Sequence, residues 1–277
     1  MRKLTVLLLP LALAACSEPP PAPPAVDGDY VVHRWPLPAI EGSAQPDMLV
    51  TDDGRLVLSW ISSEPGRRNA LRTVTLAENG HWQSAPRTVV VGNSLVANWA
   101  NVPHIAYTPG VIWIHWLQEA GEGHAADVAL SRTTDAGFNW SAPVLVNDDG
   151  TATEHGFASM WPAADGKLGI AWLDGRNKAG QPAESHEGMD HHAGEASTQL
   201  RAAFFDAALQ RSDEQVVDTM TCDCCQTAAV VTDKGPLLVY RDASAEGIRD
   251  IAVSRYDGSA WSEPATVHAD GWKIAAC

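Results

Sequence analysis

Apolar runs that end in an aromatic residue recur along this chain. They span residues 56–60, 111–116, 168–172 and 237–240, and their aromatic ends are 56, 56 and 68 residues apart. The runs contain β-branched residues and glycines mark the turns, a pattern that predicts strands rather than helices. A period of this length is typical of a propeller or a solenoid. We therefore expect an all-β fold built from repeated units.

Each unit repeats one order of elements. A segment with proline is followed by a glycine turn, the strand with the aromatic end, a polar loop and another strand. A corner that runs from a tryptophan to a proline follows at residues 82–86, 140–143 and 261–264. The innermost strands are expected near residues 46–50, 102–107, 157–162 and 225–231. The strands after the polar loops are expected at residues 71–76, 127–132, 200–205 and 250–255. Four strands per unit make a propeller blade, and the third unit is longer because of an insertion at residues 177–197.

Residues 133–140, Thr-Thr-Asp-Ala-Gly-Phe-Asn-Trp, fit the pattern S/T-x-D-x-G-x-x-W, the Asp box of sialidase-like propellers. Degenerate copies lie at residues 254–261 and 78–82. On these motifs residues 40–277 resemble the sialidase (neuraminidase) superfamily with BNR repeats. The resemblance implies a sialidase-like β-propeller, with four blades and the start of a fifth present and six blades when complete. It also implies that the box residues, Asp135, Gly137 and Trp140, are structural.

The first residues resemble a bacterial lipoprotein signal. Arg2 and Lys3 precede an apolar stretch and the sequence Leu-Ala-Ala-Cys16, so residues 1–15 are read as the signal peptide and Cys16 as the lipidated residue. An ordinary signal peptide or a short anchor is the alternative. Residues 16–29 are expected to be a proline-rich tether, and residues 30–277 an incomplete propeller domain. The predicted location is the cell envelope, on the periplasmic or surface side of the outer membrane.

The chain is strongly acidic. Its formal charge is −15, or −17 once Arg2 and Lys3 are removed, and such a charge repels phosphate backbones and anionic lipids. Nucleic-acid binding is therefore excluded, and contact with the membrane is expected through the lipid only. The chain has no serine-hydrolase elbow, phosphate loop or dinucleotide fingerprint.

The resemblance places chemistry at the mouth of the central channel. A sialidase needs three arginines for the substrate carboxylate, an aspartic acid, and a tyrosine nucleophile. The predicted catalytic residues are Arg176, Arg241, Arg249 and Asp47. Rim salt bridges with nearby aspartates are the alternative for the arginines. Four more residues are predicted to line the cleft: Asn101, His155, Asp223 and Gln226.

One family feature is missing. Sialidases carry Arg-Ile-Pro at the first inner strand, where this chain has Ala44-Gln45-Pro46, and this departure weakens the prediction of catalysis. Trp99 and Trp161 could stack on a sugar or fill the interfaces between blades, and the interface is the preferred interpretation.

Cysteine forms an unusual cluster of Cys222, Cys224 and Cys225, with Cys277 at the matching start of the next unit. In an exported protein the first expectation is a disulfide from Cys277 to the cluster. The alternatives are a copper(I) or zinc site and redox-active or buried thiols. In a strand, Cys222 and Cys224 would face one side and Cys225 the other.

The insertion carries a second set of soft ligands, His186, Met189, His191 and His192. These residue types suit copper, zinc or nickel, and a solvated loop is the alternative. The sequence thus predicts an exo-sialidase-like protein of the cell envelope that processes or binds a glycan or another small molecule. The alternative is a noncatalytic propeller for metal handling or assembly, with copper or zinc as the candidate metals.

Overall fold

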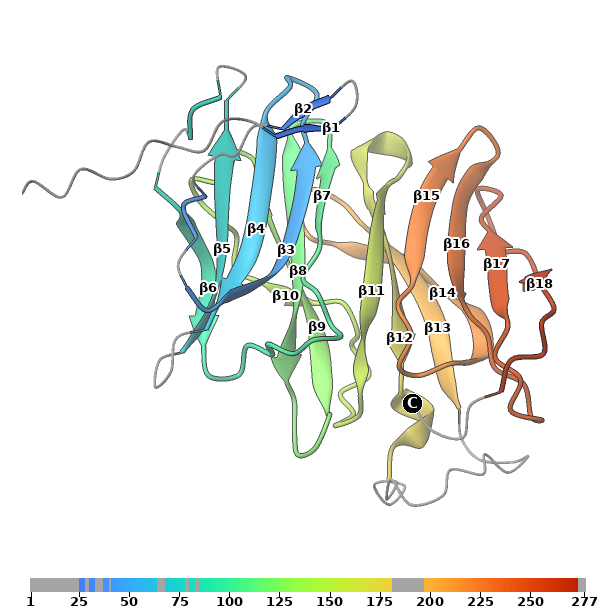
Figure 1. The fold of residues 1–277 in the computed structure, drawn as a ribbon. Helices are drawn as coiled ribbons and strands as arrows, with labels where there is room; N and C mark the ends of the chain where they lie inside the picture. Colours follow the sequence, from blue (N-terminus) through green and yellow to red (C-terminus); the bar gives the residue numbers. More distant parts are fainter. Residues whose placement is uncertain are drawn as a thin grey trace, which may run out of the picture. The chain divides into compact units, whose positions relative to one another are not determined.

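The computed structural model describes residues 25–27, 30–32, 37–39, 41–63, 68–77, 80–82, 85–180 and 197–273 (Figure 1). The chain divides into two compact units, Met1–Leu37 and Pro38–Cys277. In the first unit, β1 (Ala25–Asp27) pairs with β2 (Tyr30–Val32) as an antiparallel hairpin. The second unit contains all the other strands.

The second unit contains four sheets, each of four strands in sequence order. Sheet I consists of β3 (Ser43–Val50), β4 (Leu56–Ser62), β5 (Asn69–Leu76) and β6 (Arg87–Gly92). Sheet II consists of β7 (Ile105–Thr108), β8 (Val111–Glu119), β9 (Ala126–Thr133) and β10 (Val144–Leu145). Sheet III consists of β11 (His155–Pro162), β12 (Leu168–Asp174), β13 (Thr198–Phe205) and β14 (Arg211–Thr221). Sheet IV consists of β15 (Ala228–Thr232), β16 (Gly235–Arg241), β17 (Ile251–Arg255) and β18 (Ala265–His268).

The first strands of successive sheets are neighbours in space. β3 contacts β7, β7 contacts β11, and β11 contacts β15. Figure 1 shows the sheets following one another from β3 to β18 in chain order. Antiparallel meanders that share their innermost strands in this way are blades of a β-propeller, and the predicted all-β propeller is confirmed.

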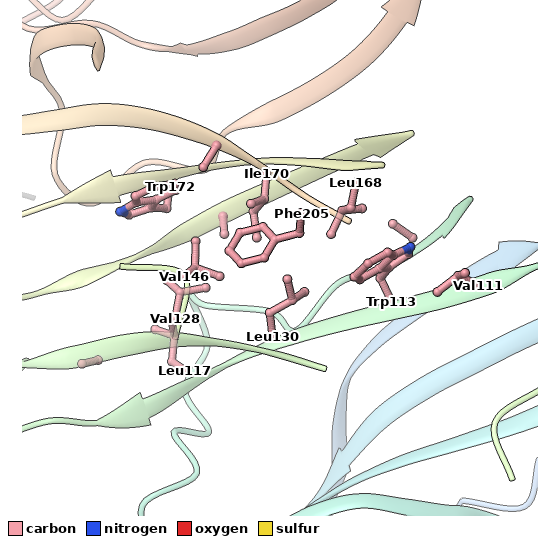
Figure 2. Packing of buried hydrophobic residues seen from close by; sticks show 14 residues of the cluster. Val111, Trp113, Leu117, Val128, Leu130, Val146, Leu168, Ile170, Trp172 and Phe205 are labelled. Atoms are coloured by element: carbon pink, nitrogen blue, oxygen red, sulfur yellow. The ribbon is translucent and has the colours of Figure 1, made fainter. Parts of the chain in front are cut away.

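Alternating side chains fill the spaces between the sheets. On β8, Trp113 and Leu117 pack toward sheet III, whereas Ile114 and Trp116 pack toward sheet I. Successive residues of a strand point to opposite faces, so one strand supplies both interfaces. Figure 2 shows the cluster between sheets II and III, in which the Phe205 ring lies among aliphatic side chains. Each such side chain stabilises the fold by about 1.5–3 kcal/mol when fully buried.

The other two interfaces are built in the same way. Phe157, Trp161 and Tyr240 belong to the cluster between sheets III and IV, and Ile61 and Leu71 to the cluster between sheets I and II. Within the described ranges the helical segments are two short 3-10 turns, η1 (Ala164–Gly166) and η2 (Arg176–Lys178). No helix in the described part of the chain has the length and apolar character to cross a bilayer.

The strand predictions were accurate except at the starts of the innermost strands of sheets II and IV. β7 begins at Ile105, whereas the prediction began at residue 102. The predicted innermost strand at residues 225–231 is observed as β15, which begins at Ala228. Residues 222–227 instead form a turned connection from β14 to β15, anchored where the Cys222 amide donates to the Arg241 carbonyl. The chain must bend here to pass from the outermost strand of one sheet to the innermost strand of the next. The predicted start of a fifth blade lies largely outside the described residues.

Candidate functional site

Most of the predicted site residues lie at one edge of sheets III and IV. In each sheet the innermost strand and the second strand are antiparallel, so the start of one lies beside the end of the other. In sheet III, His155 at the start of β11 therefore pairs in register with Asp174 at the end of β12. In sheet IV, Thr221 forms a bridge with Asp242 at the corresponding position. The residues before β11 and β15 therefore lie near those that follow β12 and β16.

The buried part of this edge is an ionic network around His155, which has no exposed surface. Its Nε2 lies 3.2 Å from Asp149 Oδ1 and 3.7 Å from Asp174 Oδ1, and its Nδ1 lies 2.9 Å from the Ala126 carbonyl oxygen. The ligand atoms of Asp149, His155 and Asp174 all lie within 4.8 Å of one another, so this group could hold a metal ion. His155 was predicted to line the cleft, but the structure places it beneath the surface.

Arg176 makes two bonds of 2.7 Å to the Asp174 carboxylate, from Nε and from one terminal nitrogen. Burial alone would raise the pKa of Asp174, but the hydrogen bonds from Arg176 outweigh it and hold the pKa below its ordinary value. Arg176 also reaches Glu214 at 3.3 Å, and Arg201 and Arg211 approach the same carboxylate at 2.8 Å. The predicted catalytic Arg176 is thus one member of a charge network within sheet III.

A small pocket opens next to this network. Its lining includes Glu154, Gly156, Phe157, Lys178 and Asp223. Lys178 Nζ lies 2.9 Å from Asp223 Oδ2. Glu154 is an exposed residue, but partial desolvation of its carboxyl group raises its pKa, and the Asp223 charge acts in the same direction. The pocket therefore holds a carboxyl group that retains its proton more readily than usual beside a paired carboxylate.

Residues 98–101 border the pocket and join three sheets. The Gln45 side chain of β3 donates to the Asn101 carbonyl at 3.0 Å and also to the Asn98 carbonyl. The Gln226 side chain, which precedes β15, donates to the Ala100 carbonyl. The Asn101 carboxamide accepts a hydrogen bond of 3.0 Å from the Phe157 amide. The structure thus brings together the predicted cleft residues Asn101 and Gln226.

Close packing fixes this junction. A side chain at Gly156 would place its Cβ 2.6 Å from Asn101 Oδ1, so the Asn101 side chain would have to move. The exposed fraction of Trp99 is 93%, which shows that its preferred interpretation as an interface residue was wrong. Trp161, by contrast, is buried between sheets III and IV with Phe204 and Trp261. Of these two tryptophans, Trp99 is therefore the one that solvent can reach.

Asp47 connects sheets I and II. Its Oδ2 accepts the Ile105 amide at 2.9 Å and lies 3.1 Å from His104 Nδ1. Burial raises the pKa of Asp47, but the bonds from His104 and Ile105 outweigh it and leave the pKa below its ordinary value. The neighbouring His115 is buried, and desolvation lowers its pKa to about 3. Asp47 is therefore held as a carboxylate between two first strands.

The two predicted arginines of sheet IV have partners within the protein. Arg241 donates to the Arg249 carbonyl at 2.5 Å, and its guanidinium lies 4.4 Å from the centre of the Trp272 ring. Arg249 is 4% exposed and lies 4.0 Å from Asp223 Oδ1. Their function as a substrate clamp, together with Arg176, stays a prediction.

The three cysteines before β15 converge. Cys222 Sγ lies 3.0 Å from Cys225 Sγ and 3.7 Å from Cys224 Sγ, and the last two sulfurs are 4.0 Å apart. The predicted opposite orientation of Cys225 was wrong because the segment is a turn and not a strand. Hydrogen bonds from Cys224 and Cys225, against the effect of burial, lower the pKa of Cys222, and Arg249 acts in the same direction.

Several predicted residues lie outside the described ranges. They are Cys16, Cys277, His186, Met189, His191 and His192. The disulfide that was predicted between Cys277 and the cluster is therefore a prediction still, while the cluster's own three cysteines are not joined by disulfides in the structure.

The turn at residues 133–140 is held by local hydrogen bonds. Asp135 Oδ1 accepts the Thr133 hydroxyl at 2.7 Å and the Asn139 amide at 2.9 Å. These bonds lower the pKa of Asp135 to about 2. Gly137 has φ of 89°, the left-handed region that glycine tolerates, and Trp140 packs against the core between sheets I and II.

Sequence reasoning missed Lys178 and Asp149 as members of this region. Lys178 follows the predicted residue Arg176 in the loop between the second and third strands of sheet III. Asp149 lies in the connection from β10 to β11, before the predicted residue His155. A broader search of both loops for charged residues would have found the two side chains.

No family model matches the chain, and no curated protein matches it. Among solved structures it is similar to Hadza microbial sialidase Hz136, with 15% identity and a TM-score of 0.50 over 84% of this chain and 47% of that one. It is also similar to a thermostable family-43 glycoside hydrolase, with 11% identity and a TM-score of 0.47 over 82% of this chain and 73% of that one. An endo-arabinase from Bacteroides thetaiotaomicron VPI-5482 has 11% identity and a TM-score of 0.46, with 82% and 81% covered. The chain spans about half the length of sialidase Hz136, and that similarity supports a sialidase-like β-propeller fold.

Proposed function

We propose that this protein is an exo-sialidase-like lipoprotein of the cell envelope that binds or processes a glycan. The observation that carries the proposal is the pocket at the edge of sheets III and IV, where Glu154 has a raised pKa and Asp223 is a paired carboxylate. Glycoside hydrolysis uses two carboxyl groups, one protonated as the general acid and one ionised. In this proposal Glu154 is the acid and Asp223 the ionised partner.

Trp99 supplies a binding surface for the same ligand. Its ring is almost fully exposed, and it lies two residues from Asn101, which contacts the pocket residue Phe157. An exposed aromatic face buries a large apolar area on contact with a ligand. A sugar ring that stacks on Trp99 would extend toward Glu154.

The choice of sugar depends on the arginines. A sialic acid would require Arg176, Arg241 and Arg249 to turn toward its carboxylate, because each now contacts a group of the protein. A neutral sugar would need no such change.

The test uses the full-length chain with a fluorogenic sialoside, a panel of neutral glycosides and a glycan array. Glu154→Gln should lower hydrolysis of the preferred substrate about 100-fold or more, since a general acid contributes about 10²–10⁴-fold. Asp165→Asn is the matched control, because Asp165 lies in the turn between β11 and β12, at the other end of the same hairpin. It should leave the rate unchanged.

Other outcomes separate binding from catalysis. If the protein binds a glycan without hydrolysing it, Trp99→Ala should weaken binding and Glu154→Gln should leave it nearly intact. Sialoside hydrolysis that survives both Arg241→Ala and Arg249→Ala would exclude these arginines as the clamp. A folded protein that neither binds nor cleaves any member of the panel would refute the glycan function.

The second candidate is noncatalytic metal handling or assembly. It is favoured by the convergence of three cysteine sulfurs within 4.0 Å, with copper or zinc as the metal. The loop that carries His186, Met189, His191 and His192 belongs to the same proposal on its composition. Metal analysis of protein purified without a nickel resin tests this function, and a stoichiometry near zero would refute it.

A further inference from the structure

His155 is a buried side chain whose two ring nitrogens have different surroundings. It has no exposed surface, and its Nδ1 lies 2.9 Å from the Ala126 carbonyl oxygen. A carbonyl oxygen only accepts hydrogen bonds, so Nδ1 carries the proton and donates it to Ala126. Within the described part of the chain, Nε2 has no hydrogen-bond partner. The nitrogen left to interact with a ligand is therefore Nε2.

Two carboxylate oxygens face this nitrogen. Asp149 Oδ1 lies 3.2 Å from Nε2, and Asp174 Oδ1 lies 3.7 Å from it. A proton on Nε2 would lie about 1 Å from the nitrogen, and in the observed geometry it makes a hydrogen bond to neither oxygen. Without a cation between them, the lone pair of Nε2 and the two anionic oxygens would repel one another. The arrangement therefore favours a cation at this point.

The spacing of the three ligand atoms fits zinc(II). Zinc binds imidazole nitrogen and carboxylate oxygen at about 2.0–2.2 Å in tetrahedral geometry, which separates two ligand atoms by about 3.3–3.6 Å. The separations from His155 Nε2 are 3.2 and 3.7 Å, and all three ligand atoms lie within 4.8 Å of one another. A backbone carbonyl at the other ring nitrogen is also a usual partner of a metal-binding histidine. We propose that Asp149, His155 and Asp174 bind one zinc(II) ion.

The chemistry of the ligand atoms supports this choice of metal. The site supplies one imidazole nitrogen and two carboxylate oxygens. Imidazole suits zinc and other divalent transition metals, and copper(I) prefers sulfur ligands. Calcium and magnesium prefer sites made of oxygen atoms alone. A divalent transition-metal ion therefore matches the site better than the other classes of cation.

The two carboxylates differ in their other partners. Arg176 would share Asp174 with the ion, since its amide and Nε donate to Asp174 Oδ1 at 3.0 and 2.7 Å. The same guanidinium lies 4.0 Å from Asp149 Oδ1, beyond hydrogen-bond distance. Burial would raise the pKa of Asp149, but hydrogen bonds, first that from the Thr151 hydroxyl, hold it below its ordinary value. Asp149 is thus a buried anion that would gain a cationic partner in the ion.

The ion would join three segments beside the pocket. Asp149 belongs to the connection from β10 to β11, His155 begins β11 and Asp174 ends β12. Glu154, the proposed general acid, directly precedes His155 in the chain. Bound zinc would therefore stabilise the strand ends that hold the pocket. The inference depends on neither proposed function, because its ligands include no cysteine and neither of the proposed pocket carboxyl groups.

The test measures zinc binding by the reduced full-length protein in competition with a chromogenic chelator. The cysteines and the loop with His186 could bind zinc themselves, so each variant is compared with the parent protein. Asp149→Asn keeps the shape of the side chain and should weaken the binding of one zinc per chain at least about 10–100-fold, the cost of losing even an outer partner of a ligand. Asp148→Asn is the matched control, because the Asp148 carboxylate contacts Arg211, and it should retain this zinc. Circular dichroism checks that both variants are folded.

A second measurement leaves the proposed ligands unchanged. In protein whose His186, His191 and His192 are replaced by alanine, the zinc X-ray absorption spectrum should include nitrogen or oxygen neighbours at about 2.0–2.2 Å. Sulfur neighbours alone, at about 2.3 Å, would overturn the site and support metal handling by the cysteines. Equal zinc affinity and content in the parent and Asp149→Asn, or an equal loss in Asp148→Asn, would also overturn it. Thermal stabilisation by calcium or magnesium as large as that by zinc would overturn the choice of ion.

Discussion

The innermost strands of sheets II and III, β7 and β11, each have a histidine at or just before their first residue. Each histidine contacts an aspartate, but the two pairs differ in how deeply they are buried. His104 pairs with Asp47 at 3.1 Å, with side chains 35% and 26% exposed. His155 pairs with Asp149 at 3.2 Å, with side chains 0% and 7% exposed. The contacts have nearly the same length, so burial is the main difference between them. Burial should therefore decide which of the two pairs stabilises the propeller.

The largest expected effect is on stability when His155 is removed. His155→Ala would delete a fully buried ring, leave the Ala126 carbonyl without its 2.9 Å partner and leave Asp149 and Asp174 facing each other. We expect the free energy of unfolding to fall by about 2–5 kcal/mol, because a fully buried side chain and its hydrogen bond are lost together. Chemical denaturation followed by tryptophan fluorescence measures it.

His104→Ala is the matched control for that experiment. Because its side chain and that of Asp47 are partly exposed, solvent screens the pair, and the loss should be about 1 kcal/mol or less. Equal losses for the two variants would show that burial does not govern the difference between these strands.

A similar contrast holds for two tyrosines of sheet IV. Tyr240 is 2% exposed and donates to Asp218 at 2.7 Å, and Tyr256 is 8% exposed and donates to Asp213 at the same distance. Desolvation and the adjacent carboxylate raise the pKa of both hydroxyls, to about 12 for Tyr256. A buried tyrosine that keeps its proton serves as a hydrogen-bond donor and not as a nucleophile.

Tyr240→Phe should therefore destabilise the protein by about 1–3 kcal/mol, since it removes the hydroxyl that donates to Asp218 Oδ2 in a buried position. Tyr256→Phe should cost less, because Asp213 can reach water. Thermal unfolding of both variants tests the order. A larger loss in Tyr256→Phe would contradict it.

The strands were predictable because their signal is local. Apolar runs with aromatic ends, as in β8 and β12, identify the strands, and the glycine turns specify where the strands end. Sheet III shows the limit of this signal, since β12 is buried at every position and does not alternate. Its length and turn residues still identified it as a strand.

The site was less predictable because it depends on contacts between distant segments. The exposure of Trp99 follows from the bonds that Gln45 and Gln226 make to residues 98–101, and no local pattern contains them. The convergence of Cys222 and Cys225 follows from a turn in a segment that reads equally well as a strand. Glu154 and His155 are neighbours in sequence, yet only the packing of β11 makes one a pocket residue and the other a core residue.

The smallest effect we expect concerns pH. Desolvation, and next the Asp218 carboxylate, raise the pKa of Asp242 from 3.8 to about 6. A group whose pKa is raised by folding contributes stability that is complete below its unfolded pKa and is lost as the pH rises through its folded pKa. The free energy of unfolding should therefore decline between pH 4 and about 6 because of this residue. Because Asp242 is only half-buried, solvent screening should limit the decline to about 1 kcal/mol or less.

Asp242→Asn removes this titration, so the variant should gain stability relative to the parent protein as the pH rises from 4 to 7. Denaturation at a series of pH values gives the difference directly. If the two proteins kept a constant difference across this range, Asp242 would titrate with its ordinary pKa. Its half-buried position would then resemble that of the His104 pair and not that of the His155 pair.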